Sequence, residues 1–360
     1  MKQSVQLPGR SFWGFLCLTA VLLAWLAKPE TVSQAAQAGL GLCAHVVIPS
    51  LFPFFVLCNL FVRRQYHRYV TTALRPVMGP LFGQSADAAG ALALGVVGGY
   101  PVGAATAFQL YDHGALDARG AARLLAFCNN AGPGFVFGVV GASLLGSARA
   151  GAALYGIHLL SALLVGMAAH ALGGGAAPAG SSKALEAPRE AFAVSFVDAV
   201  KDAAVTMLQV SAFLVFFAVL LAFLRAAPFW RALTGLACRL PSGGAAAEGL
   251  LQGVWELSSG IHSLSAAEGA ALPVCCSLLL GWGGLCVHCQ TLALRGRRPI
   301  PMRPYFLGKA AQAALSALLT FLFFQKPLLA ALSIPLAAGA LALLTQKTKQ
   351  PTGKTATDGV

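Results

Sequence analysis

The chain contains 360 residues, of which 57% are hydrophobic and only 10% are charged, and its mean hydropathy is +0.72. About a quarter of the residues of a soluble domain are charged, so this composition excludes an ordinary soluble protein and predicts a polytopic membrane protein. The formal net charge of +13 does not indicate nucleic-acid binding, because the basic residues form short clusters between apolar runs. We therefore interpret the charge as a sign of membrane topology, and expect a lipid bilayer and no nucleic acid as the partner of the protein.

Apolar runs of spanning or near-spanning length predict an all-α polytopic protein with about ten transmembrane segments. The first run follows Lys2 and Arg10, as in a signal peptide, but only Trp-Leu-Ala precedes Lys28 and Pro29 as a cleavage region. We therefore expect an uncleaved N-terminal signal-anchor span within residues 1–35. The predicted segments are 12–27, 36–62, 88–110, 124–145, 151–172, 203–224, 249–264, 270–294, 305–324 and 327–344.

Clusters of basic residues predict the orientation of these segments. With both termini in the cytoplasm, every cluster would lie on the cytoplasmic side: Arg63, Arg64, Arg68 and Arg75; Arg225, Arg231 and Arg239; Arg295, Arg297, Arg298 and Arg303; and Lys347, Lys349 and Lys354. A stretch rich in Gly, Ala, Pro and Ser predicts a flexible linker at 173–200. We expect a C-terminal helical hairpin at 295–345 and a basic cytoplasmic tail at 346–360.

Two parts of the chain, 36–172 and 201–294, show weak internal similarity. The separation from Tyr100 to Asn129 resembles that from Glu256 to Gly284, so two polar breaks recur at an offset of about 155 residues. Internal repeats of this kind are typical of transporters. Ten full spans would give the repeats the same orientation, whereas one re-entrant hairpin, for example at 249–264, would change that parity.

Glycine-rich breaks interrupt the apolar runs at GGYPVGA, FCNNAGPGF and GWGGLCVHCQ. Lipid cannot satisfy the backbone groups that a break exposes, so such breaks occur where they line an enclosed cavity. A helix restarting after Pro101 would direct free N–H groups into the cavity and favour an anion, and Asn129 and Asn130 would add amide groups. For the single glycines the alternative is a kink or a close helix contact.

Glu256 is a carboxylate well inside an apolar run. An acidic side chain at the centre of a membrane helix costs about 2.5–3.5 kcal/mol on insertion scales, so Glu256 should be protonated, paired or bound to a cation. We expect it to couple transport to H⁺ or Na⁺, beside a polar break at Ser258, Ser259 and Gly260. The alternative is that 249–264 is too short to span and that Glu256 lies near the surface.

His288 lies between Cys286 and Cys289, a group that could hold a soft metal, but the spacing matches no standard zinc motif. We therefore predict no metal and no cofactor, and interpret His288 and Gln290 as groups that line the cavity. The sequence has no GxxxxGK[ST] phosphate loop, no HExxH and no GxSxG, so it predicts neither an ATP motor nor an enzyme.

The order IPSLFPFF, GYPVGA, FCNNAGP, ELSSG and GGLCVHCQ resembles the YlbJ family of sporulation integral membrane proteins, within the nucleoside-recognition Gate group. The resemblance covers roughly 40–294 and implies a protein made during endospore formation that transports a small anionic solute. It suggests dipicolinate, moved from mother cell toward forespore, and the outer forespore membrane as the location. The resemblance also implies that one site is formed by residues at the matching positions of this sequence, which are Gly99, Tyr100, Pro101, Asn129, Asn130, Glu256, Ser258, Ser259, Gly283, Gly284 and His288.

Two other functions fit the same sequence. A nucleoside-type solute would pair its ribose hydroxyls with amides and carboxylates, whereas a non-transporting scaffold would recruit a sporulation membrane-protein partner through the basic loops. An ionised Glu256 would repel a dianion. The anion hypothesis therefore requires that Glu256 be protonated, or paired with a cation, when the substrate binds.

Overall fold

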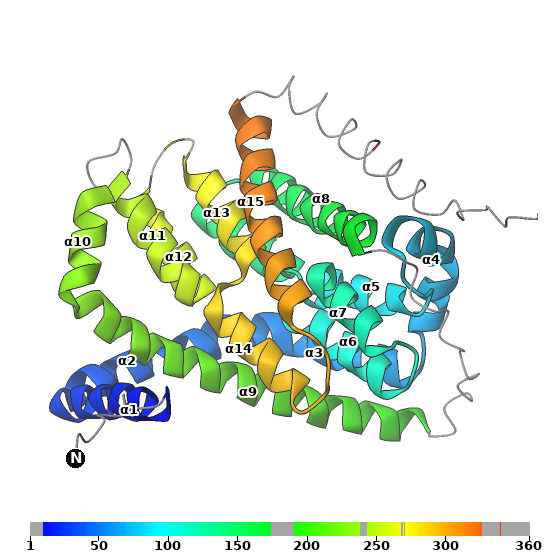
Figure 1. Cartoon of the computed structure of the whole chain (residues 1–360), viewed down its shortest axis with the longest axis horizontal. Coiled ribbons are helices and arrows are strands. Elements are labelled where there is room, and N and C mark those ends of the chain that lie inside the picture. Colours follow the sequence, from blue (N-terminus) through cyan, green and yellow to red (C-terminus); the bar gives the residue numbers. More distant parts are fainter. Residues whose placement is uncertain are drawn as a thin grey trace, which may run out of the picture.

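The computed structural model describes residues 10–173, 191–237, 243–267, 269, 271–325 and 339, and every regular element within them is helical (Figure 1). The all-α prediction is confirmed. The predicted span 327–344, apart from residue 339, and the tail 346–360 lie outside the described residues. The elements are α1 (Arg10–Ala27), α2 (Pro29–Leu42), η1 (Cys43–Val47), α3 (Ile48–Arg63), α4 (His67–Phe82), α5 (Ala88–Gly98), α6 (Val102–Asp112), α7 (Ala118–Cys128), η2 (Gly134–Leu144), α8 (Ala148–Gly173), α9 (Phe192–Ala226), α10 (Pro228–Ala237), α11 (Gly243–Trp255), α12 (Leu257–Ser263), η3 (Leu264–Ala266), α13 (Ala271–Trp282), α14 (Gly284–Arg295) and α15 (Arg303–Gln325).

The elements fall into two matching series. The first series consists of a long arm (α2, η1 and α3), α4, the pair α5–α6, the pair α7–η2 and α8. The second series has the same order: a long arm (α9), α10, the pair α11–α12, the pair α13–α14 and α15. The spacing supports the match, because α5 begins at Ala88 and α11 at Gly243, 155 residues later, as do α8 at Ala148 and α15 at Arg303. The second series therefore extends from Phe192 to Gln325, beyond the predicted range 201–294 and into the predicted C-terminal hairpin.

The pairs α5–α6 and α11–α12 are helical hairpins. A Cβ on Gly103 would lie 3.0 Å from the Cα of Gly95, and one on Gly260 would meet the backbone of Gly253, so in each hairpin the two helices pack against each other. The prediction of a single span at 88–110 is wrong, because the chain reverses at Gly99, whose φ of +77° suits glycine. At 249–264 the structure shows the re-entrant alternative, with the turn at Glu256.

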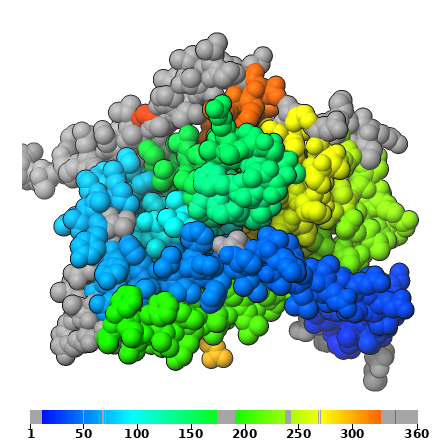
Figure 2. Space-filling model, turned by 180° about the vertical axis from the view of Figure 1, so that it is seen from behind, coloured from blue at the N-terminus to red at the C-terminus, as the bar shows by residue number. Residues whose placement is uncertain are grey.

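The two long arms run antiparallel. Arg63 at the end of the first arm pairs with Asp202 near the start of α9, at 2.6 Å, and the Sγ of Cys43 donates to the carbonyl of Ser211 farther along α9. From behind, the first arm crosses the molecule above α9 (Figure 2). The relative orientation of the two repeats in the membrane stays a prediction.

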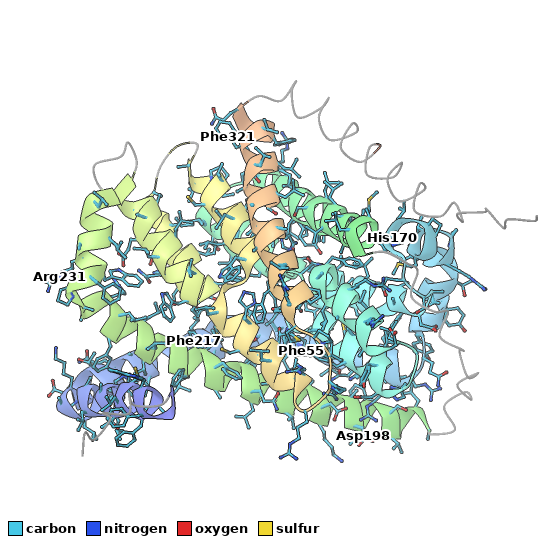
Figure 3. All side chains as sticks on the ribbon, viewed as in Figure 1. Phe55, His170, Asp198, Phe217, Arg231 and Phe321 are labelled. Carbon is cyan, nitrogen blue, oxygen red and sulfur yellow. The ribbon has the colours of Figure 1, made fainter. Side chains whose placement is uncertain are left out.

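This arrangement separates the basic clusters. Arg63 lies at the start of α9, whereas Arg225 and Arg231 lie at and beyond its other end, and Asp198 and Arg231 mark these two ends (Figure 3). A helix of 35 residues is about 50 Å long, more than the hydrocarbon thickness of a bilayer. That all clusters lie on one side of the membrane stays a prediction. The start of α9 at Phe192 also shortens the predicted linker 173–200, because the apolar segment after residue 191 is helical.

Four helices are long and apolar enough to cross a membrane, by length and composition: Ala148–Gly173, Phe192–Ala226, Ala271–Arg295 and Arg303–Gln325. The bent pair Phe12–Ala27 and Pro29–Val47, with 94° between its helices, makes up to five in the described part. The predicted count of ten spans is not confirmed, since hairpins and short helices account for several of the apolar runs.

Helices α8 and α15 meet at the centre of the molecule. Ser161 and Ser316, which are equivalent by the offset of 155 residues, share a hydrogen bond of 2.7 Å between their hydroxyls. Glycines bring neighbouring helices close to α15, because a Cβ on Gly281 would lie 2.6 Å from the Cα of Ala313. The centre is therefore a tightly packed junction of the two repeats, and the helix breaks lie beside it.

Candidate solute-binding site at four helix breaks

Four interruptions of the helices meet beside the α8–α15 junction. They are the two hairpin tips, at Gly99–Pro101 and at Glu256, and the breaks at Asn129–Pro133 and at Gly283. The hydroxyl of Tyr100 donates to the carbonyl of Leu280 at 2.6 Å, which joins the first tip to the second break. The sequence thus predicted breaks that come together in space, although they lie in different halves of the chain.

Backbone contacts of glycine hold these breaks together. A Cβ on Gly99 would lie 2.8 Å from the Cα of Gly132, and one on Gly284 would lie 3.0 Å from the amide nitrogen of Leu257. Each broken helix therefore touches the hairpin of its own half. At Gly283 a Cβ would lie 3.3 Å from the Cζ of Tyr100, so the first hairpin tip also touches the second break.

Glu256 caps the second helix of its hairpin. Its Oε1 accepts from the backbone N–H of Ser258 at 2.8 Å, and its Oε2 accepts from that of Ser259 at 2.6 Å. Both oxygens accept, as an ionised carboxylate does, and a carboxylate suits the N-terminal end of a helix. The side chain is 3% exposed, so the alternative that Glu256 lies near the surface is not what the structure shows.

Lys309 on α15 is a fully buried ammonium that the sequence analysis missed. Its Nζ donates to the carbonyl of Asn129 at 2.9 Å, to the Oε1 of Gln312 at 2.7 Å and to the hydroxyl of Tyr100 at 3.2 Å. Three acceptors satisfy the three N–H groups of an ammonium. Within the described part of the chain Lys309 forms no salt bridge. The available signal was a lysine inside the apolar run 305–324, because ionisable residues in membrane segments mark functional sites by default.

Asn129 and Asn130 secure the first break. The amide of Asn129 donates to Thr291 at 3.3 Å, and the Oδ1 of Asn130 accepts from Gln312 at 3.0 Å. His158 adds a further support, since its Nε2 accepts from the backbone N–H of Ala131 at 3.0 Å. Both asparagines are fully buried and use their amides on protein partners, so in this state they hold the break in place.

His288 packs among aromatic rings. Its Nδ1 lies 2.8 Å from the hydroxyl of Tyr305, and the rings of Trp282 and Phe306 pack edge-on against it. His288 does not line the cavity between the breaks, whereas Gln290 does. Among the described residues no group of three or more His, Cys, Asp or Glu side chains is placed to hold a metal ion.

A cavity of about 70 Å³ lies between the breaks and the arms. Its polar wall consists of Tyr100, Glu256, Ser258 and Gln290, and both arms contribute apolar side chains: Val46, Val47, Leu51, Val210 and Leu214. This volume is well below the range of about 300–1,000 Å³ that is typical of small-molecule sites. A solute of the usual size would require the arms and breaks to move apart.

Two comparisons with known proteins show what the chain is similar to. Residues 44–199 match the family model described as Gate, nucleoside recognition, which covers the first repeat from η1 to the start of α9. Over 337 residues the chain is 28% identical to the sporulation integral membrane protein YlbJ of Bacillus subtilis (strain 168), covering 87% of this chain and 82% of that protein. The chain is thus similar to YlbJ over most of its length, and part of it is similar to the Gate family. This confirms the resemblance seen in the motifs.

No solved structure matches the chain. The likeness to YlbJ and the apolar helices together make this protein an integral membrane protein. Of the residues predicted for the site, Tyr100, Glu256 and Ser258 line the cavity; Gly99, Pro101, Asn129, Asn130, Gly283 and Gly284 form the surrounding tips and breaks; and Ser259 and His288 lie beside them. The role of these residues in this protein stays a prediction.

Proposed function

We propose that this protein is a carrier, and not an enzyme, that moves a small anionic solute across a membrane during endospore formation. The observation that carries the proposal is the buried ammonium of Lys309 at the meeting point of the helix breaks, bonded to Asn129 and Tyr100 and to no carboxylate in the described part. A buried charge without a counterion is costly, which favours a function for it. An incoming carboxylate could serve as its counterion.

The solute that we propose is dipicolinate, moved from mother cell toward forespore across the outer forespore membrane, as the resemblance of the motifs implies. A planar dicarboxylate offers oxygens to an ammonium and to amide donors. The carboxylate of Glu256 would repel it. We propose that Glu256 takes up H⁺ or a Na⁺ ion when the solute binds, which would couple transport to an ion gradient. A sporulation membrane-protein partner would supply any further energised step.

A nucleoside-type solute is the second candidate. The cavity wall favours it, because Glu256, Ser258 and Gln290 together offer donors and acceptors that suit ribose hydroxyls. The description of the matching family as nucleoside recognition points the same way. Competition by nucleosides, but not by dipicolinate, would identify this case.

The test is uptake of radiolabelled dipicolinate into proteoliposomes that contain the full-length protein, with and without a proton or sodium gradient. We expect saturable uptake that falls by about a hundredfold in Lys309→Met, an effect of about 2.7 kcal/mol on the transport barrier. Lys201→Met, which removes an exposed lysine of α9, is the matched control and should transport normally.

Absence of dipicolinate and nucleoside uptake by folded protein would contradict the carrier proposal and favour a scaffold. Uptake that is equal in Lys309→Met and in the wild type would retain a carrier and remove Lys309 from anion recognition. The melting temperature of each variant, measured in the same detergent, distinguishes a lost site from a lost fold.

A further inference from the structure

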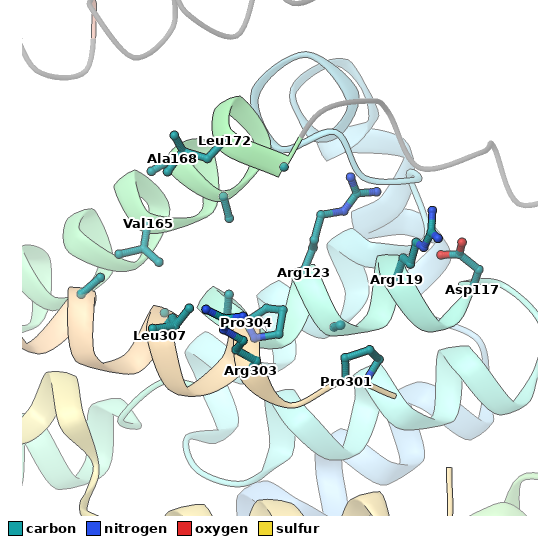
Figure 4. A pocket seen from close by; sticks show the side chains of 16 residues that line it. Asp117, Arg119, Arg123, Val165, Ala168, Leu172, Pro301, Arg303, Pro304 and Leu307 are labelled. Atoms are coloured by element: carbon teal, nitrogen blue, oxygen red, sulfur yellow. The ribbon is translucent and has the colours of Figure 1, made fainter. Parts of the chain in front are cut away.

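Lys309 has a cavity on each side and lines neither of them. The larger cavity, of about 720 Å³, opens between α7, the C-terminal half of α8 and the start of α15, with Arg303 and Leu307 in its wall (Figure 4). The smaller cavity is the one between the four breaks. Under the proposed function an anion must reach the ammonium of Lys309, so the groups that separate this ammonium from each cavity decide how it is reached.

Toward the larger cavity, the separation consists of packed backbone. Gly308 lines that cavity, and a Cβ on Gly308 would lie 2.8 Å from the Cα of Ala126 on α7. Helices α7 and α15 therefore touch along their backbones beside Lys309, as closely as small residues permit. An opening on this side would require the two helices to separate.

Toward the smaller cavity, one side chain contacts both the cavity and the ammonium. Tyr100 lines this cavity, and the Nζ of Lys309 lies over its ring, 5.0 Å from the ring centroid. The same Nζ donates to the hydroxyl of Tyr100 at 3.2 Å. Because an aromatic face attracts a cation within about 6 Å, the ring and the hydroxyl together serve as partners of the buried charge.

The position of Tyr100 is tied to the second break. Its hydroxyl accepts from Lys309 and donates to the carbonyl of Leu280 at 2.6 Å, near the end of α13. At Gly283 a Cβ would lie 3.3 Å from the Cζ of Tyr100, so the ring packs against the break itself. A movement of Tyr100 away from the ammonium would therefore break both hydrogen bonds and release a contact of the second break.

We propose that Tyr100 controls access to Lys309: its side chain covers the ammonium, and an anionic solute binds when Tyr100 turns away. This inference rests on the proposed function and changes the expected role of Tyr100, from a group that binds the solute to one that competes with it. A carboxylate offers the ammonium a full negative charge and charge-assisted hydrogen bonds, which a ring and a hydroxyl do not. A neutral solute lacks that advantage, so Tyr100 selects for anions.

The first test measures the affinity of the full-length protein in detergent for radiolabelled dipicolinate. A weakened competitor lets the solute bind more tightly, so Tyr100→Phe, which loses the hydroxyl and keeps the ring, should lower the Kd by about tenfold. Tyr100→Leu, which loses both, should lower it further. Tyr155→Phe is the matched control and should bind as the wild type does, because the hydroxyl of Tyr155 likewise donates to a backbone carbonyl, that of Val96 at 2.7 Å.

The sign of the change distinguishes the two roles. Weaker binding by Tyr100→Phe, in protein that melts as the wild type does, would make Tyr100 a binding residue and overturn the proposal. An unchanged Kd would overturn it as well, because Tyr100 would then have a structural role alone. Absence of binding by the wild type would instead contradict the proposed function, and a second measurement, which needs no solute, then decides on Tyr100.

The second test measures access to position 309. Lys309→Cys places a thiol there, and 2-sulfonatoethyl methanethiosulfonate, a small anionic reagent, modifies a thiol that it reaches. We expect modification of position 309, followed by peptide mass spectrometry, to be at least about tenfold faster when Tyr100→Ala is added, because the uncovered state becomes more populated. Ser316→Cys, at a fully buried position of the same helix, is the control and should react slowly in both backgrounds.

Equal rates at position 309 with and without Tyr100→Ala would overturn the proposal. Faster modification of Ser316→Cys in the Tyr100→Ala background would overturn it too, because the substitution would then have loosened the whole junction of α8 and α15. Melting temperatures in the same detergent show whether each variant is folded, and Tyr100→Leu takes the place of Tyr100→Ala if the latter is not.

Discussion

Helices α8 and α15 occupy equivalent places in the two halves of the molecule, and their central serines, Ser161 and Ser316, touch each other. By the same offset of 155 residues, the position that corresponds to Lys309 in the first half is the buried, apolar Leu154. The hairpin tips differ likewise, with Tyr100 in one and Glu256 in the other.

The two halves therefore share a backbone and differ in charge. Closely packed glycines occur in both hairpins, at Gly103 and at Gly260, because both must bring two helices together. The buried ammonium and the buried carboxylate occur only in the second half of the described chain. Packing is thus a property of the repeat, whereas the chemistry depends on the residues that break its symmetry. Substitutions at matched positions can separate the two.

The largest expected effects concern the shared packing. In Gly260→Ala the new methyl group would lie 2.8 Å from the carbonyl oxygen of Gly249, and in Gly103→Ala it would lie 2.8 Å from the carbonyl carbon of Cys128. We expect each change to destabilise the protein by about 1–3 kcal/mol or more, and by similar amounts in the two halves. Thermal unfolding in detergent, followed by intrinsic fluorescence, measures this.

Gly156→Ala is the control for both variants, because nothing lies within 4 Å of the added Cβ. If Gly260→Ala melts at the temperature of this control, the second hairpin does not pack as described. If Gly103→Ala alone is harmful, the two halves do not share their packing.

The next effect concerns the charge that only the second hairpin carries. Glu256→Gln keeps one oxygen acceptor for the α12 cap but loses the negative charge, so the helix should form while coupling is lost. We expect the acceleration of uptake by an inward proton gradient to fall by about tenfold, which corresponds to about 1.4 kcal/mol. Uptake into proteoliposomes over a series of external pH values measures it.

Glu248→Gln changes the same residue type on the neighbouring α11, where the carboxylate pairs with Arg225, and should retain coupling. Full transport by Glu256→Gln at every pH would remove Glu256 from coupling. The matched change at the first tip, Tyr100→Phe, should leave the gradient dependence unchanged, because it removes a hydrogen bond and no charge.

The sequence predicted the helix breaks well because they depend on local chemistry. Glycines, prolines and adjacent asparagines indicate a break wherever they interrupt an apolar run. The fold-back at 88–110 was missed because two antiparallel half-helices have the same hydropathy as one spanning helix. Lys309 was missed because its partners Asn129 and Tyr100 lie 180 and 209 residues away along the chain.

The smallest expected effect concerns a contact that joins the two halves, the ion pair of Asp112 on α6 with Arg298 beyond α14. Arg298 donates to both carboxylate oxygens, at 2.7 and 2.6 Å, and these hydrogen bonds lower the pKa of Asp112. A lowered folded-state pKa contributes stability that is present above the unfolded value of about 3.9 and is lost as the pH falls through the folded value. Because the two side chains are 31% and 41% exposed, solvent screening limits the contribution to less than about 1 kcal/mol.

Asp112→Asn should therefore lower the melting temperature by no more than about 2 °C at pH 7, and the difference from the wild type should shrink below pH 4 and in 1 M salt. A difference that persists unchanged at pH 3 would mean that Asp112 stabilises the junction of the halves by packing, and the ion pair would then contribute nothing measurable.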